Sequence, residues 1–236
     1  MHADIIANLQ YVRERIAQAS ARAGRDAETV RLVAVSKTHP AESVGTAIAA
    51  GVAAFGENKI QEAEGKIALL GPTSAEWHLI GHLQSNKARR AVQLFDVIQS
   101  VDSVDLATRL ERLCVEEGRP NLSVFAQVDL AGETTKSGIS EADLPELAVY
   151  LGDCKHLRFD GLMVLPPYAD DPDTSRPYFV RLRNLRDQLA ADDAFAEGGC
   201  GDLSMGMSHD FEAAIEEGAT VVRVGTAIFG EREYKG

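Results

Sequence analysis

Eight short apolar runs, separated by longer polar or helical stretches, constrain the fold of this chain more than any other feature. The runs are Leu32–Ser36, Val52–Phe55, Trp77–Ile80, Val97–Val101, Val124–Val128, Leu162–Leu165, Leu203–Met205 and Val221–Val224. Helical periodicity between them is clearest in Ala41–Ala50, Val104–Glu117, Leu144–Leu151, Tyr178–Leu189 and Phe211–Glu217. Alternating strands and helices favour a parallel sheet with helices outside it, and near-continuous apolar strands are typical of strands buried on both faces.

Eight such units in 236 residues predict an α/β fold, a single (β/α)8 TIM barrel. An open doubly wound sheet is the alternative, and the barrel is favoured because no GxGxxG motif opens the first unit. Ile5, Leu9, Val12 and Ile16 follow helical spacing and predict an extra amphipathic N-terminal helix. No low-complexity linker divides the chain, so we expect one domain over residues 1–236.

Composition narrows the classes of partner. The formal net charge is -12, whereas nucleic-acid binders usually gather Lys and Arg on one face. Cys114, Cys154 and Cys200 are odd in number and lack CxxC spacing, which argues for a reducing compartment. No signal-peptide pattern and no membrane-spanning apolar run is present. We therefore expect a cytoplasmic monomer that binds neither nucleic acid nor membranes.

Lys37 directly follows the first apolar run, and in a barrel the carboxyl ends of all strands meet at the mouth where active sites are built. A lysine at the inward end of such a run is costly unless it is paired or deprotonated. A deprotonated amine forms Schiff bases with carbonyl compounds. The alternative is a lysine at the rim of the barrel that reaches into solvent.

The ends of runs seven and eight carry Ser204 and Ser208, then Gly225 and Thr226. Barrel loops at these two positions often hold a phosphate, because hydroxyl and backbone N–H groups donate to it. Together with Lys37 they predict a ligand that bears both a carbonyl and a phosphate group. Two classes fit: a phosphorylated sugar in a lysine-dependent aldolase, and pyridoxal 5′-phosphate (PLP).

Arg223, at the end of run eight, bears on that choice. A cation facing a pyridine nitrogen would keep the nitrogen unprotonated and weaken the ring as an electron sink. A surface salt bridge or a direct phosphate contact is the alternative role. His78 and His82 have the four-residue spacing of helical zinc sites, but they stand at a strand end without an adjacent Glu, so no metal site is expected.

Seven ordered segments carry a family resemblance that spans almost the whole chain. They are Ala34–Thr38, Phe55–Asn58, Trp77–Lys87, Lys136–Gly138, Gly161–Met163, Leu203–Ser208 and Val222–Gly230. In these segments the chain resembles the pyridoxal phosphate homeostasis proteins. The resemblance implies a barrel like the N-terminal domain of alanine racemases, with PLP as the cofactor and Lys37 as its Schiff-base lysine.

The resemblance also implies roles for the surrounding residues. Ser204, Ser208, Gly225 and Thr226 would surround the phosphate, Arg223 would lie by the pyridine nitrogen, and Asn58 and Met163 would line the ring pocket. The expected function is storage, buffering or delivery of PLP, with PLP-dependent apo-enzymes as possible recipients and no catalytic residue assigned. We expect no robust turnover, because the chain ends six residues after Gly230, without the second domain that alanine racemases use. A PLP-dependent amino-acid racemase is the alternative.

Overall fold

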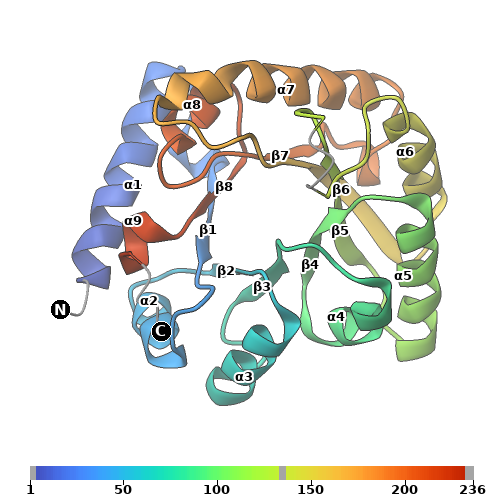
Figure 1. Ribbon diagram of the computed structural model, residues 1–236, viewed down its shortest axis with the longest axis horizontal. Helices are drawn as coiled ribbons and strands as arrows, with labels where there is room; N and C mark the ends of the chain where they lie inside the picture. Colours follow the sequence, from blue (N-terminus) through green and yellow to red (C-terminus); the bar gives the residue numbers. More distant parts are fainter. Residues whose placement is uncertain (1–3, 133–136, 232–236) are drawn as a thin grey trace.

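The computed structural model describes residues 4–132 and 137–231, which form a closed barrel of parallel strands in the order β1 to β8 with helices around it (Figure 1). The strands are β1 (Arg31–Val35), β2 (Ala54–Glu57), β3 (Glu76–Leu79), β4 (Val97–Val101), β5 (Leu122–Val128), β6 (Leu157–Val164), β7 (Asp202–Ser204) and β8 (Val221–Val224). β1 closes the barrel by pairing with β8, so that Ala34 lies beside Val224. The predicted fold class, an α/β (β/α)8 barrel, is confirmed.

The helices lie on the outside of the barrel. The α-helices are α1 (Ile5–Arg22), α2 (Ala41–Ala49), α3 (Ile60–Leu70), α4 (Ala88–Leu94), α5 (Val104–Glu117), α6 (Leu144–Asp153), α7 (Arg176–Ala191), α8 (Phe211–Glu216) and α9 (Thr226–Phe229). Short 3-10 helices are η1 (Ala27–Thr29), η2 (Ser85–Lys87), η3 (Pro172–Ser175) and η4 (Ala196–Gly198). Within the described ranges, none of these helices is both long and apolar enough to cross a lipid bilayer.

The predicted N-terminal helix is α1, which packs against α8 and α9 at the seam where the barrel closes (Figure 1). Asp4 caps it by accepting a hydrogen bond from the Ala7 N–H. Its inward face includes the buried residues Leu9 and Val12, and burial of such side chains stabilises a fold by about 1.5–3 kcal/mol each. Asn8 Nδ2 donates to the carbonyl oxygen of Ile228 at 2.9 Å, which ties the first helix to the last.

The hydrophobic core has two parts. The larger part lies between the strands and the surrounding helices, as expected for parallel strands buried on both faces. The smaller part fills the inside of the barrel with Val33, Ala54, Val97, Phe125, Met163 and Val221. The buried polar side chains His78, Gln99 and Arg223 also come from barrel strands. The inside of the barrel is therefore filled with side chains, a few of them polar, and a ligand can bind only at its ends.

Candidate functional site

The residues predicted to form the site follow the carboxyl ends of strands, and the fold brings those ends to one mouth. Lys37 stands two positions after the end of β1, and Asn58 directly follows β2. Gly225 and Thr226 form the junction between β8 and α9. Because β1 and β8 are hydrogen-bonded neighbours, the lysine turn and the β8–α9 junction emerge side by side.

Lys37 is half-buried in a turn whose flanking residues are held in place. Thr38 has a φ of 68°, a left-handed conformation that β-branched residues rarely adopt, and its N–H donates to Glu62 Oε2 at 2.9 Å. The His39 ring stacks on Phe229 with centroids 5.0 Å apart, and the His39 N–H donates to the Ser36 carbonyl at 3.0 Å. The turn is thus fixed to α3 on one side and to α9 on the other.

A buried ion pair lies directly behind this turn. Lys66 Nζ is 2.5 Å from Glu57 Oε1 and also donates to the carbonyl oxygen of Ser36 at 2.6 Å. The Ser36 hydroxyl donates to the same Glu57 oxygen at 2.6 Å. Burial raises the pKa of the Glu57 carboxyl, and the attraction of Lys66 offsets that rise only in part. These contacts fix Ser36, the residue that precedes Lys37.

Ser208 organises the β8–α9 junction. Its Oγ accepts hydrogen bonds from the N–H groups of Gly225 at 3.1 Å and Ala227 at 3.3 Å. A Cβ on Gly225 would stand 3.2 Å from the carbonyl oxygen of Val35, so a side chain there would crowd the end of β1. Thr226, exposed, begins α9 between these two donors. The structure therefore brings Ser208, Gly225 and Thr226 together beside the strand that leads to Lys37.

Arg223 and Ser204 form a separate cluster inside the barrel. Both are buried, and Arg223 Nη1 donates to Ser204 Oγ at 2.6 Å while Nη2 donates to the Val164 carbonyl at 2.8 Å. Met163, also buried, pairs with Ser204 across the β6–β7 ladder. Burial lowers the pKa of Arg223 to about 10, which leaves the guanidinium charged at neutral pH. The Ser204 hydroxyl thus lies with Arg223, and no described contact joins it to Ser208.

Asn58 is half-buried and its backbone abuts Gly81. A Cβ at position 81 would lie 2.3 Å from the Asn58 carbonyl oxygen and 2.8 Å from its Cα, which no real side chain can do. Glycine at 81 is therefore required for the β2 and β3 ends to approach each other.

The structure also places most of the Lys136–Gly138 segment and the two histidines His78 and His82. Lys136 lies outside the described residues, whereas Ser137 accepts a hydrogen bond from Gln127 Nε2 through its carbonyl oxygen at 2.5 Å. His82 lies 3.4 Å from Asp102, and His78 points elsewhere, toward Gln99 and Glu76. Among residues 4–132 and 137–231, no three His, Cys, Asp or Glu side chains are grouped as metal ligands would be.

Sequence reasoning missed Glu57, Lys66 and Gln99 as residues that support the site. Gln99 interrupts the apolar run Val97–Val101, and a lone amide in a buried strand is a signal for an internal hydrogen bond. Lys66 stands on the buried face of α3 with Ala63 and Ile67. That face could have been found from its spacing, but its partner Glu57 could not, because the pairing depends on tertiary structure.

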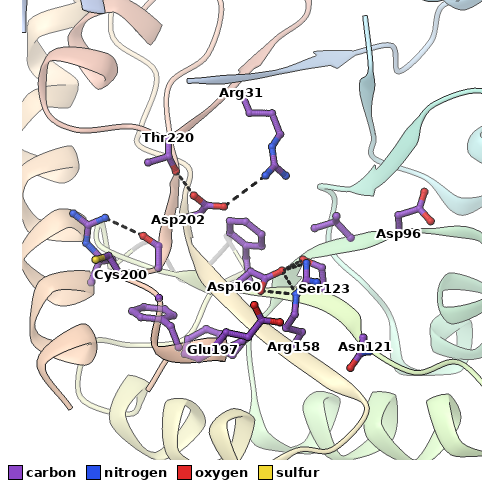
Figure 2. Close-up of a pocket in the computed structure, with 18 of the residues that line it drawn as sticks. Arg31, Asp96, Asn121, Ser123, Arg158, Asp160, Glu197, Cys200, Asp202 and Thr220 are labelled. Atoms are coloured by element: carbon purple, nitrogen blue, oxygen red, sulfur yellow. Dashed lines mark hydrogen bonds and ion pairs between the residues drawn. The ribbon is translucent and has the colours of Figure 1, made fainter. Parts of the chain in front are cut away.

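A hollow of about 820 Å³ lies at the opposite, amino-terminal end of the barrel (Figure 2). It is lined by residues at the starts of strands, among them Arg31, Glu76, Arg158 and Asp202. Arg31 contacts Glu76 at 3.5 Å, and Arg158 contacts Asp160 at 2.8 Å. Its charges are thus largely paired with one another, which is typical of the stabilising end of a barrel.

A closed barrel with a lysine after its first strand and gathered backbone donors after its last defines an alanine racemase-like barrel. The model of the family described as "Alanine racemase, N-terminal domain" matches residues 7–233. The chain belongs, within that group, to the family of pyridoxal phosphate homeostasis proteins. It is 46% identical to the pyridoxal phosphate homeostasis protein of Pseudomonas aeruginosa over 230 residues, which cover 98% of this chain and 96% of the relative. It is 41% identical to that of Aquifex aeolicus over 226 residues, covering 96% and 97%.

Solved structures agree with this placement. PipY from Synechococcus elongatus, whose structure has PLP bound, is 41% identical and superposes with a TM-score of 0.80, covering 93% of this chain and 100% of PipY. The alanine racemase of Corynebacterium glutamicum shares the fold at 19% identity and a TM-score of 0.64, with 95% of this chain matched to 61% of that one. The racemase likeness is one of fold alone.

Proposed function

We propose that this protein binds PLP as a Schiff base on Lys37 and serves intracellular PLP homeostasis by storing, buffering or delivering the cofactor. The observation that carries the proposal is the pairing of β1 with β8, which places the Lys37 turn beside the N–H groups of Gly225 and Ala227. The likeness to PLP-bound PipY supports the same ligand.

The phosphate of PLP fits the β8–α9 junction. Backbone N–H groups at the start of a helical turn suit an anion, and those of Gly225 and Ala227 already converge on a single oxygen, Ser208 Oγ. The hydroxyls of Ser208 and Thr226 add further donors. In this proposal Gly225, Thr226 and Ser208 hold the phosphate while Lys37 holds the other end of the ligand.

The pyridine ring fits on the side of Arg223. Its guanidinium is buried, charged and fixed by Ser204 and Val164, so it can face the ring nitrogen without reorganising. Ser204, expected from the sequence among the phosphate donors, instead supports Arg223 in this proposal. Asn58 and Met163 complete the ring pocket in this proposal.

PLP, when bound, supplies an aldehyde that reacts with amines and a ring that can withdraw electrons from the adduct. Because Arg223 lacks an accepting atom, it favours an unprotonated ring nitrogen and so weakens that withdrawal. This supports a protein that retains the cofactor over one that turns substrates over with it. The homeostasis names of the relatives favour the same reading over an amino-acid racemase.

The cellular setting is part of the same proposal. The free thiols Cys114, Cys154 and Cys200 fit the reducing cytoplasm. The protein acts as one PLP-binding domain over residues 1–236 and as a monomer, with PLP-dependent apo-enzymes as recipients and no nucleic-acid or membrane partner. Light scattering of the purified protein tests the monomer, and reactivation of a PLP-dependent apo-enzyme by the loaded protein tests delivery.

Titration of the purified protein with PLP, followed by visible absorbance, tests the central claim. A Schiff-base band should appear, and borohydride reduction followed by peptide mass spectrometry should place the label on Lys37. Lys37→Ala should abolish the band, whereas Lys59→Ala, which removes an exposed lysine next to Asn58, should retain it. A label on another lysine, or an unchanged band in Lys37→Ala, would overturn the assignment. A chiral assay across the common amino acids tests turnover, and robust racemisation that depends on Lys37 would favour the racemase.

A further inference from the structure

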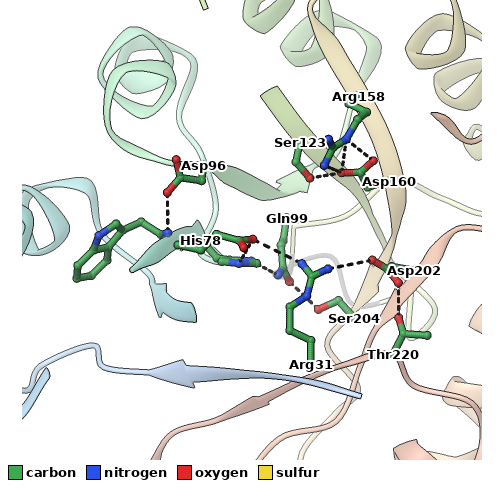
Figure 3. A network of polar contacts seen from close by, with 12 residues as sticks. Arg31, His78, Asp96, Gln99, Ser123, Arg158, Asp160, Asp202, Ser204 and Thr220 are labelled. Atoms are coloured by element: carbon green, nitrogen blue, oxygen red, sulfur yellow. Dashed lines mark hydrogen bonds and ion pairs between the residues drawn. The ribbon is translucent and has the colours of Figure 1, made fainter. Parts of the chain in front are cut away.

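Four buried or half-buried side chains lead from Arg223 through the inside of the barrel, and Figure 3 shows three of them, Ser204, Gln99 and His78, side by side. Arg223 Nη1 donates to Ser204 Oγ at 2.6 Å, and Ser204 Oγ donates to Gln99 Oε1 at 2.6 Å. Gln99 Nε2 lies 2.8 Å from His78 Nδ1, and His78 Nε2 lies 2.8 Å from Glu76 Oε1. Ser204, Gln99 and His78 are fully buried, so water does not compete for the contacts among these three side chains.

The contacts share one direction of donation. Arginine has only donors, so Ser204 Oγ accepts from Arg223, and the Ser204 hydroxyl in turn donates to the carbonyl oxygen of Gln99. The Gln99 amide then turns its NH2 group toward His78 Nδ1, which must accept and carry no proton. The proton of a neutral His78 ring is therefore on Nε2, where it faces the carboxylate of Glu76.

At the Glu76 end of this series of contacts, charge sets the direction of donation. Glu76 begins β3 at the amino-terminal end of the barrel, where Arg31 approaches it at 3.5 Å. The contact with His78 lowers the pKa of Glu76 despite the opposing effect of its burial, so the carboxylate stays ionised at neutral pH. An ionised carboxylate at one end and a guanidinium at the other both favour the same direction of donation.

We infer that Gln99 and His78 are positioning residues for Arg223: a one-way hydrogen-bond chain from Arg223 through Ser204 and Gln99 to His78, whose Nε2 lies beside the Glu76 carboxylate, holds the guanidinium against the cofactor ring. The inference rests on the proposed function for its ligand and on the described contacts for its geometry. Loss of the Gln99 amide would leave the Ser204 proton without its acceptor and free the hydroxyl to rotate away from Arg223. The ring environment would then change although Gln99 touches no ligand.

The tautomer of His78 tests the hydrogen-bond chain in the apo wild-type protein. Nitrogen-15 NMR of the histidine side chains at neutral pH should show His78 as the neutral ring with its proton on Nε2, assigned by the signals lost in His78→Leu. A proton on Nδ1, or a doubly protonated ring, would reverse the Gln99 amide and overturn the inference. This result does not depend on whether PLP binds.

Cofactor spectra test the positioning role. Gln99→Leu keeps the side-chain size but removes the amide that accepts from Ser204. It should shift the PLP absorbance band and weaken PLP binding by about threefold to tenfold, the range expected for the loss of one hydrogen bond. Ser100→Ala is the matched control, because Ser100 is the next residue of β4, is buried, and its hydroxyl has no hydrogen-bond partner among the described residues. It should change neither the band nor the affinity.

The outcomes separate the two proposals. A folded Gln99→Leu with a lower melting temperature but an unchanged band and affinity would make Gln99 merely structural and overturn the positioning role. A wild-type protein that forms no band on Lys37 would overturn the proposed function instead, while the His78 tautomer would still decide whether the chain exists.

Discussion

The Lys66 ammonium and the Glu57 carboxylate lie 2.5 Å apart in the wall of the barrel, and both also bind Ser36, the residue before Lys37. Both side chains are almost completely excluded from water. A buried ion pair of this kind adds little net stability over an apolar pair, but removing one partner leaves an uncompensated charge. The pair therefore holds the Lys37 turn in place, and breaking it would cost the fold a large part of its stability.

Lys66→Met should destabilise the protein by about 3–5 kcal/mol at pH 8. Burial already raises the pKa of Glu57, and loss of Lys66 would raise it further. A carboxyl whose pKa is higher in the folded than in the unfolded state contributes stability below its unfolded pKa and loses it as pH rises through its folded pKa. The loss should therefore shrink at pH 5, as measured by urea unfolding. Lys59→Met, at an exposed lysine, should cost under about 0.5 kcal/mol at both pH values. An equal loss at both pH values in Lys66→Met would contradict the prediction.

Ser208→Ala should weaken PLP binding about fivefold to tenfold, because one hydroxyl that organises the Gly225 and Ala227 donors is lost. Pyridoxal, which lacks the phosphate, is the matched control ligand and should bind the variant and the wild type equally. Fluorescence or absorbance titration measures both. Equal weakening for the two ligands would mean that Ser208 supports the barrel mouth in general and not the phosphate.

Gly81→Ala should destabilise the protein by about 1–3 kcal/mol and weaken PLP binding, since its Cβ would displace the Asn58 backbone. Gly65→Ala provides the contrast. Gly65 lies in α3, a Cβ there would meet nothing within 4 Å, and alanine should stabilise the helix by about 0.5–1 kcal/mol. Thermal and urea unfolding compare the two variants, and a neutral Gly81→Ala would refute the close approach.

Thiol reactivity should be confined to Cys200 in the native protein. Burial raises the pKa of Cys114 to about 11 and that of Cys154 to about 12, so neither forms thiolate at pH 8. Cys200 is exposed. Brief alkylation with iodoacetamide followed by mass spectrometry should find one modified site, absent in Cys200→Ser and joined by two more in urea. Native labelling of Cys114 would show that its cover opens readily.

The fold was predictable because each strand is buried on both faces and therefore stands out as an apolar run. Val97–Val101, Val221–Val224 and the helix Val104–Glu117 have the predicted bounds. β6 begins at Leu157, five residues before the predicted start, because Arg158 and Asp160 interrupt its first half and bind each other at the barrel end. α3 and α4 were not predicted, since Lys66 interrupts the buried face of α3 and α4 is only seven residues long.

The candidate site was predictable as a set of strand ends but not as a geometry. Ser204 and Ser208 are close in sequence and both carry hydroxyls, so the sequence offers no reason to separate them. Alternation along β7 turns Ser204 into the barrel toward Arg223, while Ser208 stands beyond the strand at the β8–α9 junction. Which hydroxyl meets which partner depends on tertiary packing, and so does the Glu57–Lys66 pair.

The closure of β1 on β8 also has a consequence for biosynthesis. Lys37 and Gly225 lie far apart in the sequence, so the proposed lysine and phosphate donors come together only after β8 has been made. The Asn8–Ile228 contact likewise forms only after β8. If the proposed site is right, we expect PLP to load only after synthesis of β8, and a product truncated before β8 to retain no ligand.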